Sequence, residues 1–220
     1  MAGSRAFGVL LGFAVLFTAR PARADTCVAI ESRFSGHIAS PLLVKTMAAE
    51  AAAIWSPYGV HLVWPLEPMN VNCDRMAGSF EVAVDRSAAL PSVRSRGLVL
   101  GRTYLQRLAI DHAPIQIDYE ATAHILESVT NEQLVALAGH PGLGSAEVGR
   151  ALGRVLAHEL GHVLLAAPNH QPHGLMRPSY VPSELIAVHR GGFTLSKGEI
   201  ERLSHRTQAL TAATVAAEEP

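Results

Sequence analysis

Two histidines and a glutamate carry the spacing in this sequence that is best suited to chemistry. His158 and His162 are four residues apart, and Glu159 directly follows the first of them. Residues four apart on a helix lie on nearly the same face, so the two imidazoles can bind one metal ion. A zinc ion held by neutral nitrogen ligands keeps an open coordination position for water. Glu159 points in a neighbouring direction, where its carboxylate can take a proton from that water.

The surrounding residues predict a helix from about residue 146 to 166, which must end before Pro168. Ser145 is its predicted N-cap, and Glu147 lies in its first turn, near the positive end of the helix dipole. Apolar residues recur around the motif at helical spacing: Leu152, Val155, Leu156, Leu160 and Val163. Two histidines and a glutamate on such a half-buried helix are costly without a partner, which favours a metal site over a chance pattern.

The motif resembles that of the zincin peptidases, and within them the metzincins. Their pattern, H-E-x-x-H-x-x-G-x-x-H followed by a methionine turn, is matched here in part. Leu165 stands where the glycine is expected, and Pro168 stands where the third histidine is expected. Residues 174–176 resemble the methionine turn, with Met176 as a hydrophobic floor beneath the metal. The resemblance covers about residues 145–180 and implies Zn2+ as the cofactor.

A third protein ligand must complete the zinc site. We predict His170, because the helix ends before Pro168 and the chain can turn there to bring this histidine back toward the metal. His173 is the second choice, since it could equally be an exposed loop residue. In the other large group of zincins the third ligand is a glutamate on a later helix, which here would be Glu184 or Glu199. Both glutamates have a simpler explanation as capping residues at helix starts.

The resemblance also implies a reaction, which is hydrolysis of an amide bond in a peptide or protein substrate. Zinc would polarise the scissile carbonyl, while Glu159 would activate water and pass its proton to the leaving amine. In some metzincins a tyrosine just after the methionine turn reaches the metal or the oxyanion, so Tyr180 is a candidate for stabilising the transition state. The alternative explanation of Tyr180 is an aromatic side chain that is simply packed against its neighbours. Two other classes stay open: an exported metal-binding protein without catalysis, and an interaction domain without a metal.

The N-terminus has the features of a signal peptide over residues 1–24. Arg5 supplies a positive charge, residues 6–17 are apolar, and residues 22–24 place small side chains at a cleavage site before Asp25. The apolar run is too short for a comfortable membrane span, although an uncleaved anchor helix is the alternative. We therefore expect a secreted or periplasmic protein that has no membrane association after cleavage.

The number of cysteines and the net charge further limit which kinds of protein this chain could be. Cys27 and Cys73 are the only cysteines, and in an oxidising compartment they are a candidate disulfide that could contribute about 3–4 kcal/mol. Two cysteines this far apart do not resemble a zinc–thiolate site. The net charge is −1 and aromatic residues make up 5% of the chain, so neither electrostatics nor base stacking points to a nucleic-acid partner. We expect a monomer.

The pattern of apolar residues predicts an α+β, zincin-like domain over residues 25–210 with a frayed tail at 211–220. Strands are predicted at residues 26–34, 60–64, 80–85, 98–101 and 115–119. Helices are predicted at residues 41–55, at 120–138 with a break near Thr130, at 146–166 and at 197–210. A mixed, twisted sheet of four or five strands would pack on the long helix 41–55 and on the active-site helix. One of the later strands would form the edge beside the metal.

Overall fold

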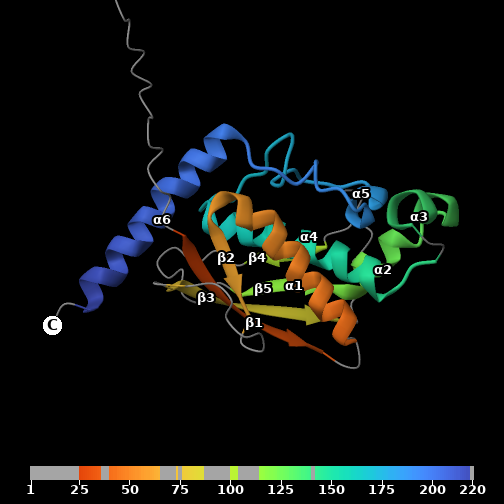
Figure 1. Ribbon diagram of the computed structural model, residues 1–220, viewed down its shortest axis with the longest axis horizontal. Coiled ribbons are helices and arrows are strands. Elements are labelled where there is room, and N and C mark those ends of the chain that lie inside the picture. Colours follow the sequence, from red (N-terminus) through yellow and green to blue (C-terminus); the bar gives the residue numbers. More distant parts are fainter. Residues whose placement is uncertain are drawn as a thin grey trace, which may run out of the picture.

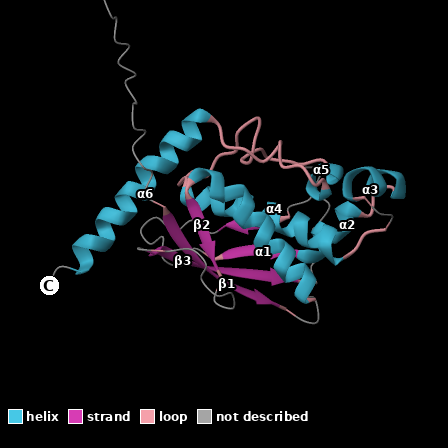
Figure 2. Ribbon diagram, viewed as in Figure 1, coloured by secondary structure: helices cyan, strands magenta, loops and turns pink. Residues whose placement is uncertain are grey.

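The computed structural model describes residues 25–35, 40–64, 73, 76–86, 100–103, 114–139 and 142–218. The predicted signal peptide lies outside these residues, as do Leu98 and Val99 of one predicted strand. In chain order the elements are β1 (Thr26–Phe34), α1 (Pro41–Trp55), the 3-10 helix η2 (Ser56–Tyr58), β2 (Val60–Val63), β3 (Met76–Asp85), β4 (Gly101–Thr103), β5 (Ile115–Asp118), α2 (Tyr119–Leu126), α3 (Asn131–Ala138), α4 (Ser145–Leu164), α5 (Pro182–Ile186) and α6 (Lys197–Glu218). Figures 1 and 2 show α1 and α4 lying together over one face of the sheet, with α6 leading away from it.

The strands form one mixed sheet, as the sequence predicted for an α+β fold. Within the described residues it has five strands in the order β2-β1-β3-β5-β4. β1 pairs in parallel with β2 and with β3, and β3 pairs in parallel with β5. β4 runs antiparallel to β5, with Gly101 opposite Ile117 and Thr103 opposite Ile115. This short antiparallel strand is therefore one edge of the sheet.

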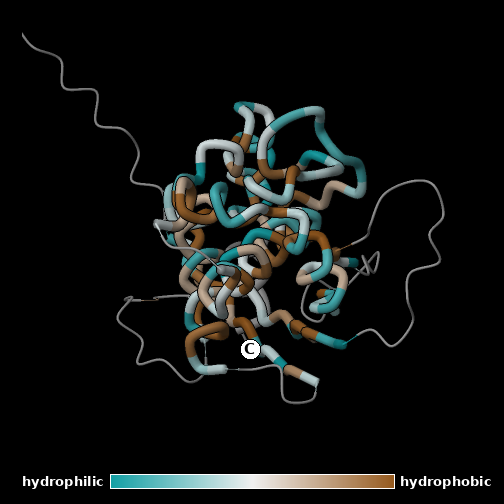
Figure 3. Tube along the Cα trace, turned by 90° about the vertical axis from the view of Figure 1, so that its right-hand side faces the viewer, coloured by the Kyte–Doolittle hydropathy of each residue, from teal (hydrophilic) through white to brown (hydrophobic). Residues whose placement is uncertain are grey.

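Alternation along the strands places apolar side chains on the face that α1 and α4 cover, because successive residues of a strand point to opposite faces. The buried strand residues include Val28, Ile30, Phe80, Val82, Val84, Ile115 and Ile117. Figure 3 shows apolar residues gathered toward the middle of the domain, with hydrophilic loops outside it. Among the described residues, no helix combines the length and the apolar composition that a membrane span requires.

Two glycines of α4 allow an unusually close approach to α1. An ideal Cβ at Gly149 would lie 2.6 Å from the Leu43 carbonyl oxygen, and one at Gly153 would lie 2.6 Å from the Met47 carbonyl oxygen. The two glycines are four residues apart and so share one face of the helix. The backbone of α1 packs directly on this face, which fixes the position of α4 and of the motif further along it.

Several predicted boundaries need correction. β3 begins at Met76, four residues before the predicted start, because Met76 pairs with Cys27 of β1. Ser145 is the first residue of α4 and Gly144 is its N-cap, whose backbone N–H donates to the Glu147 carboxylate at 3.0 Å. The last helix, α6, ends at Glu218, eight residues past its predicted end at residue 210. The alanines and the absence of glycine and proline from residues 211–218 favour this continuation.

β4 shares only Gly101 with the predicted strand 98–101, and α4 ends at Leu164, two residues before its predicted end, whereas other elements agree closely with the structure. α1 covers the predicted residues 41–55, and the predicted break near Thr130 separates α2 from α3. A disulfide joins Cys27 to Cys73 and thereby ties the start of β1 to the segment before β3. The cysteine prediction is therefore confirmed.

Candidate metal centre

One turn of α4 presents three polar side chains within the core. His158, Glu159 and His162 are only 8%, 5% and 7% exposed. The Nε2 atoms of the two histidines face each other at 3.2 Å, and their rings are almost perpendicular, with an interplanar angle of 87°. The spacing of four residues thus brings both imidazoles to one point, as the helical geometry predicted.

The other nitrogen of each ring is held by a backbone carbonyl. Nδ1 of His158 donates to the Leu175 carbonyl oxygen at 2.8 Å, and Nδ1 of His162 donates to the Ala167 carbonyl oxygen at 2.6 Å. A carbonyl oxygen only accepts, so each Nδ1 carries the proton and each Nε2 keeps a free lone pair. Burial lowers the pKa of His158 to about 4, which keeps this imidazole neutral. In a neutral imidazole whose proton is on Nδ1, Nε2 carries the lone pair, so the two facing Nε2 atoms are the ones that a metal would meet.

His170 is the third member of the cluster. Its ring centre lies 5.2 Å from that of His158 and 5.0 Å from that of His162. One ligand atom from each of the three histidines lies within 4.8 Å of the others, so the three can hold a metal ion. Among the described residues this group contains His170 and not His173, although both side chains are exposed on the same loop. Burial, with a smaller effect from His162, lowers the pKa of His170.

The turn after α4 brings His170 back over the helix. Leu165, at the position where the metzincin pattern has glycine, has an ordinary helical conformation with φ −90°. The left-handed conformation is taken one residue later by Ala166, with φ 47°, which is uncommon for a residue with a Cβ. The Ala167 N–H then donates to the His162 carbonyl oxygen at 3.1 Å. This turn directs the chain back toward the two histidines.

The segment that resembles a methionine turn lies beneath the cluster. Gly174 has φ 78°, and Leu175 and Met176 are fully buried. The Met176 sulfur packs so closely on Gly161 that a Cβ there would collide with it. The Leu175 carbonyl is the acceptor for His158, as described above. The turn therefore packs directly against α4, through Met176 on Gly161 and through the Leu175 carbonyl on His158.

The edge strand β4 holds the side chain of Glu159. Oγ1 of Thr103 donates to Oε2 of Glu159 at 2.6 Å. A Cβ at Gly101 would lie 2.7 Å from Oε1 of Glu159, so the glycine leaves the space that the carboxylate occupies. Burial raises the pKa of Glu159, while the Thr103 hydrogen bond and the nearby His162 act in the opposite direction. Sequence reasoning missed Thr103, because no local pattern connects residues 56 positions apart.

The other residues weighed from the sequence have different partners. The Tyr180 hydroxyl donates to the Leu175 carbonyl oxygen and lies 3.1 Å from Nδ1 of His158, the nitrogen opposite to the one that faces His162. Burial raises the pKa of Tyr180, so its hydroxyl stays a donor. Glu184 accepts from the Val181 N–H at 3.1 Å, and Glu199 accepts from the Ser196 N–H at 2.6 Å. Both glutamates cap helices, in agreement with the simpler explanation.

A buried arginine anchors the chain beyond this loop. Arg154, one turn before His158 on α4, donates from Nε to Oε1 of Glu50 at 2.8 Å, and the side chains of this pair are 0% and 4% exposed. Its other nitrogens donate to the backbone carbonyl oxygens of Glu184, Ala187 and His189. One charged side chain thus joins α1, α4 and the segment around α5.

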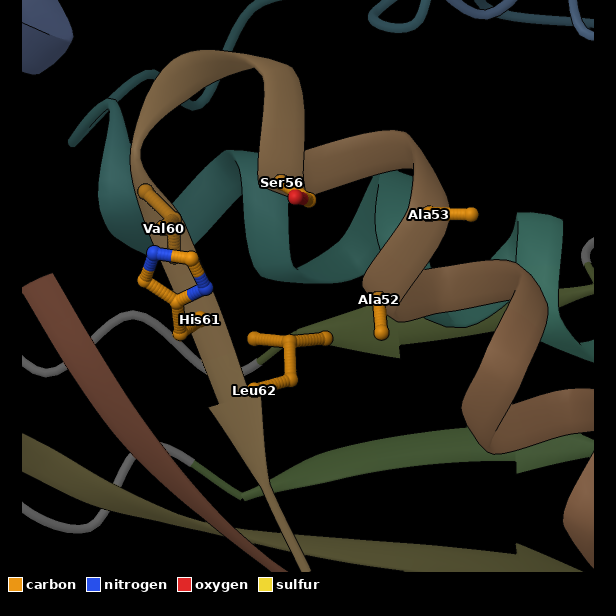
Figure 4. A pocket seen from close by; sticks show the side chains of 6 residues that line it. All are labelled: Ala52, Ala53, Ser56, Val60, His61 and Leu62. Carbon is orange, nitrogen blue, oxygen red and sulfur yellow. The ribbon is translucent and has the colours of Figure 1, made fainter. Parts of the chain in front are cut away.

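A separate cavity lies at the edge of the sheet opposite to β4. It has a volume of about 320 Å³ and lies between α1 and β2, as Figure 4 shows. Its lining residues are Ala52, Ala53, Ser56, Val60, His61 and Leu62. None of the three clustered histidines lines it, so it is not part of the candidate metal centre.

Two comparisons with known proteins were negative. A search with protein-family models found none that matches the chain, and a search of curated proteins found no similar sequence. The geometry of the histidine cluster is therefore the basis for a functional proposal.

Proposed function

We propose that this protein is an exported zinc hydrolase with a zincin-like fold that cleaves peptide bonds. The observation that carries the proposal is the 3.2 Å separation of the Nε2 atoms of His158 and His162. Two nitrogens that each lie about 2.0–2.1 Å from a tetrahedral zinc ion are about 3.3–3.4 Å apart. The two imidazoles thus fit zinc with almost no movement, and His170 is close enough to supply the third ligand.

The chemistry of the donors supports zinc among the common metals. Three neutral imidazoles suit zinc and leave a fourth position open, which is the arrangement of a catalytic site. The backbone carbonyls on both Nδ1 atoms fix the rings in the orientation that binding needs. A zinc ion held there would lower the pKa of bound water to about 7 and polarise a substrate carbonyl.

Glu159 supplies the proton transfer in this proposal. Its carboxylate lies beside the cluster and is held there by Thr103. Because burial raises its pKa, the carboxylate accepts a proton more readily than an exposed glutamate does. It can keep that proton and deliver it to the leaving amine, as a general base that becomes a general acid must do.

The edge of the sheet supports a peptide substrate, and the disulfide supports an oxidising compartment. β4 is an edge strand beside α4, and an extended peptide could add to such an edge by main-chain hydrogen bonds. The antiparallel edge next to the helix with the motif also supports a zincin-like assignment. The Cys27–Cys73 disulfide supports an oxidising compartment, such as the periplasm or the cell exterior.

Zinc stoichiometry tests the site. We expect about one zinc per chain in the purified protein, measured by atomic absorption. His170→Ala should lose most of this zinc, whereas the matched change His173→Ala on the same loop should keep it. A wild-type protein without zinc, or zinc loss in His173→Ala only, would contradict the proposed ligand set.

Hydrolysis tests the reaction. We expect the zinc-loaded protein to cleave members of a fluorescence-quenched peptide library. Glu159→Gln should keep its zinc and lose about 10²–10⁴-fold in rate, because it removes the general base alone. A zinc-loaded wild type that cleaves no peptide would favour the exported metal-binding protein over the enzyme.

A further inference from the structure

The Leu175 carbonyl oxygen accepts hydrogen bonds from two side chains next to the candidate metal centre. One is Nδ1–H of His158 at 2.8 Å, and the other is the hydroxyl of Tyr180. The tyrosine oxygen also lies 3.1 Å from that same Nδ1. The three groups form a closed triangle, so the position of the His158 ring depends on where the tyrosine hydroxyl lies.

The Tyr180 ring is itself held firmly. It stacks on Phe193 with ring centres 5.1 Å apart and an interplanar angle of 18°. The Arg177 guanidinium lies 4.5 Å from the centre of the Tyr180 ring, and the buried Arg154 guanidinium lies 4.5 Å from that of Phe193. Stacking and cation–π contacts of this kind restrain the position of the ring. The Tyr180 ring is thus held by Phe193 and Arg177, and Arg154 of α4 in turn contacts Phe193.

We propose that Tyr180 is a positioning residue for the metal ligand His158, through the Leu175 carbonyl that both side chains share. The proposal rests on the proposed zinc site. By holding the carbonyl and the ring together, the hydroxyl keeps the proton of His158 on Nδ1 and leaves Nε2 facing His162. Tyr180 thereby prepares the ligand before any metal binds.

This role differs from stabilisation of the transition state, which the resemblance to metzincins implied. A group that stabilises an oxyanion must reach the open position of a bound metal, which lies on the Nε2 side of the His158 ring. The Tyr180 hydroxyl instead contacts the opposite nitrogen of His158, and its proton is given to a backbone carbonyl. The two roles make different predictions, because positioning affects metal affinity and oxyanion stabilisation does not.

Tyr180→Phe tests the proposal, because it keeps the ring, its stacking and its volume while removing the hydroxyl. Outer partners of metal-ligating histidines typically contribute 10–100-fold in metal affinity. We therefore expect Tyr180→Phe to bind zinc at least about 10-fold more weakly, measured by competition with a chromophoric chelator. Tyr119→Phe, which removes a hydroxyl at the start of α2, is the matched control and should bind within about twofold of wild type.

A second measurement separates positioning from a general loss of structure. Long-range 1H–15N NMR on the metal-free protein reports which nitrogen of His158 carries the proton. Tyr180→Phe should reduce the share of the Nδ1–H form at pH 7, with an unfolding midpoint close to that of Tyr119→Phe. Unchanged zinc affinity in Tyr180→Phe overturns the proposal, as does weaker binding with an unchanged tautomer. If the wild-type protein binds no zinc, the proposed function fails and this inference fails with it. If wild type binds zinc and only the Tyr180→Phe results differ from those expected, the proposed zinc site stands and the role of Tyr180 is refuted.

Discussion

The close contact between α1 and α4 predicts that replacing Gly153 with alanine destabilises the protein. Helix propensity alone would predict the opposite, a gain in stability. At an exposed helical position, Gly→Ala stabilises by about 1 kcal/mol. At Gly153 an ideal Cβ would lie 2.6 Å from the Met47 carbonyl oxygen and 2.8 Å from Cβ of Glu50. Carbon atoms in contact normally stay about 3.5–4.0 Å apart, so the two helices would have to separate by roughly 1 Å.

The expected cost follows from these two opposing effects. Overpacking of a core costs about 1–3 kcal/mol, and contact with a backbone that cannot turn aside places Gly153→Ala at the upper end. After subtraction of the gain in helix propensity, we expect a net loss of about 2 kcal/mol in the free energy of unfolding. For a domain of this size, each kcal/mol shifts the melting temperature by about 2–4 °C, so the midpoint should fall by about 4–8 °C.

Thermal unfolding followed by circular dichroism measures this shift. Gly198→Ala is the matched control, since Gly198 lies in the first turn of α6 and nothing lies within 4 Å of its ideal Cβ. That change should raise the midpoint by about 1–4 °C. A Gly153→Ala protein that melts at or above the wild-type temperature would refute the close approach of the two helices.

Three further changes test other parts of the structure. Glu50→Gln leaves the buried Arg154 without its carboxylate, and urea unfolding should show a loss of about 3–5 kcal/mol, against less than about 1 kcal/mol for the exposed Glu81→Gln. Thr103→Val removes the hydrogen bond to Glu159 and should slow peptide hydrolysis by about 10-fold or more, while loss of zinc in this variant would count against the assignment. Reduction of the disulfide, which spans a sequence separation of 46, should lower the free energy of unfolding by about 4 kcal/mol, and an unchanged urea midpoint would contradict this estimate.

The parts of the fold that the sequence predicted well are those with a local cause. α1 follows from apolar residues at helical spacing, and the pairing of His158 with His162 follows from their separation of four residues. The choice of His170 over His173 followed from a similarly local fact, the end of a helix before Pro168. In each case the residues that set the geometry are neighbours in the chain.

The parts that the sequence did not predict depend on distant partners. Thr103 is 56 residues from Glu159, and Arg154 is 104 residues from Glu50. The periodicity of apolar residues along the chain does not predict pairs that are so far apart in the sequence. One indication was present, because Gly149 and Gly153 share a helix face, and small residues at this spacing often allow another backbone to approach. An arginine one turn before the histidine motif could likewise have been recognised as a buried charge that needs a partner.

The loop that carries His170, the proposed third ligand, shows why the distant anchor matters for the proposed function. Leu165 stands where the metzincin pattern has glycine, Ala166 takes the left-handed conformation, and His170 lies two residues beyond the position of the third histidine in that pattern. That loop is closed by tertiary contacts: the Leu175 N–H donates to the Thr194 carbonyl oxygen at 2.8 Å, and Arg154 holds the segment around α5 by three backbone carbonyls. The position of His170 therefore depends on this anchor as well as on the turn after α4. Glu50→Gln, which loosens Arg154, should for this reason weaken zinc binding as well as stability, although the ion-pair partners of Glu50 are Arg154 and Arg190. A variant that loses stability but binds zinc as tightly as wild type would show that the turn after α4 positions His170 by itself.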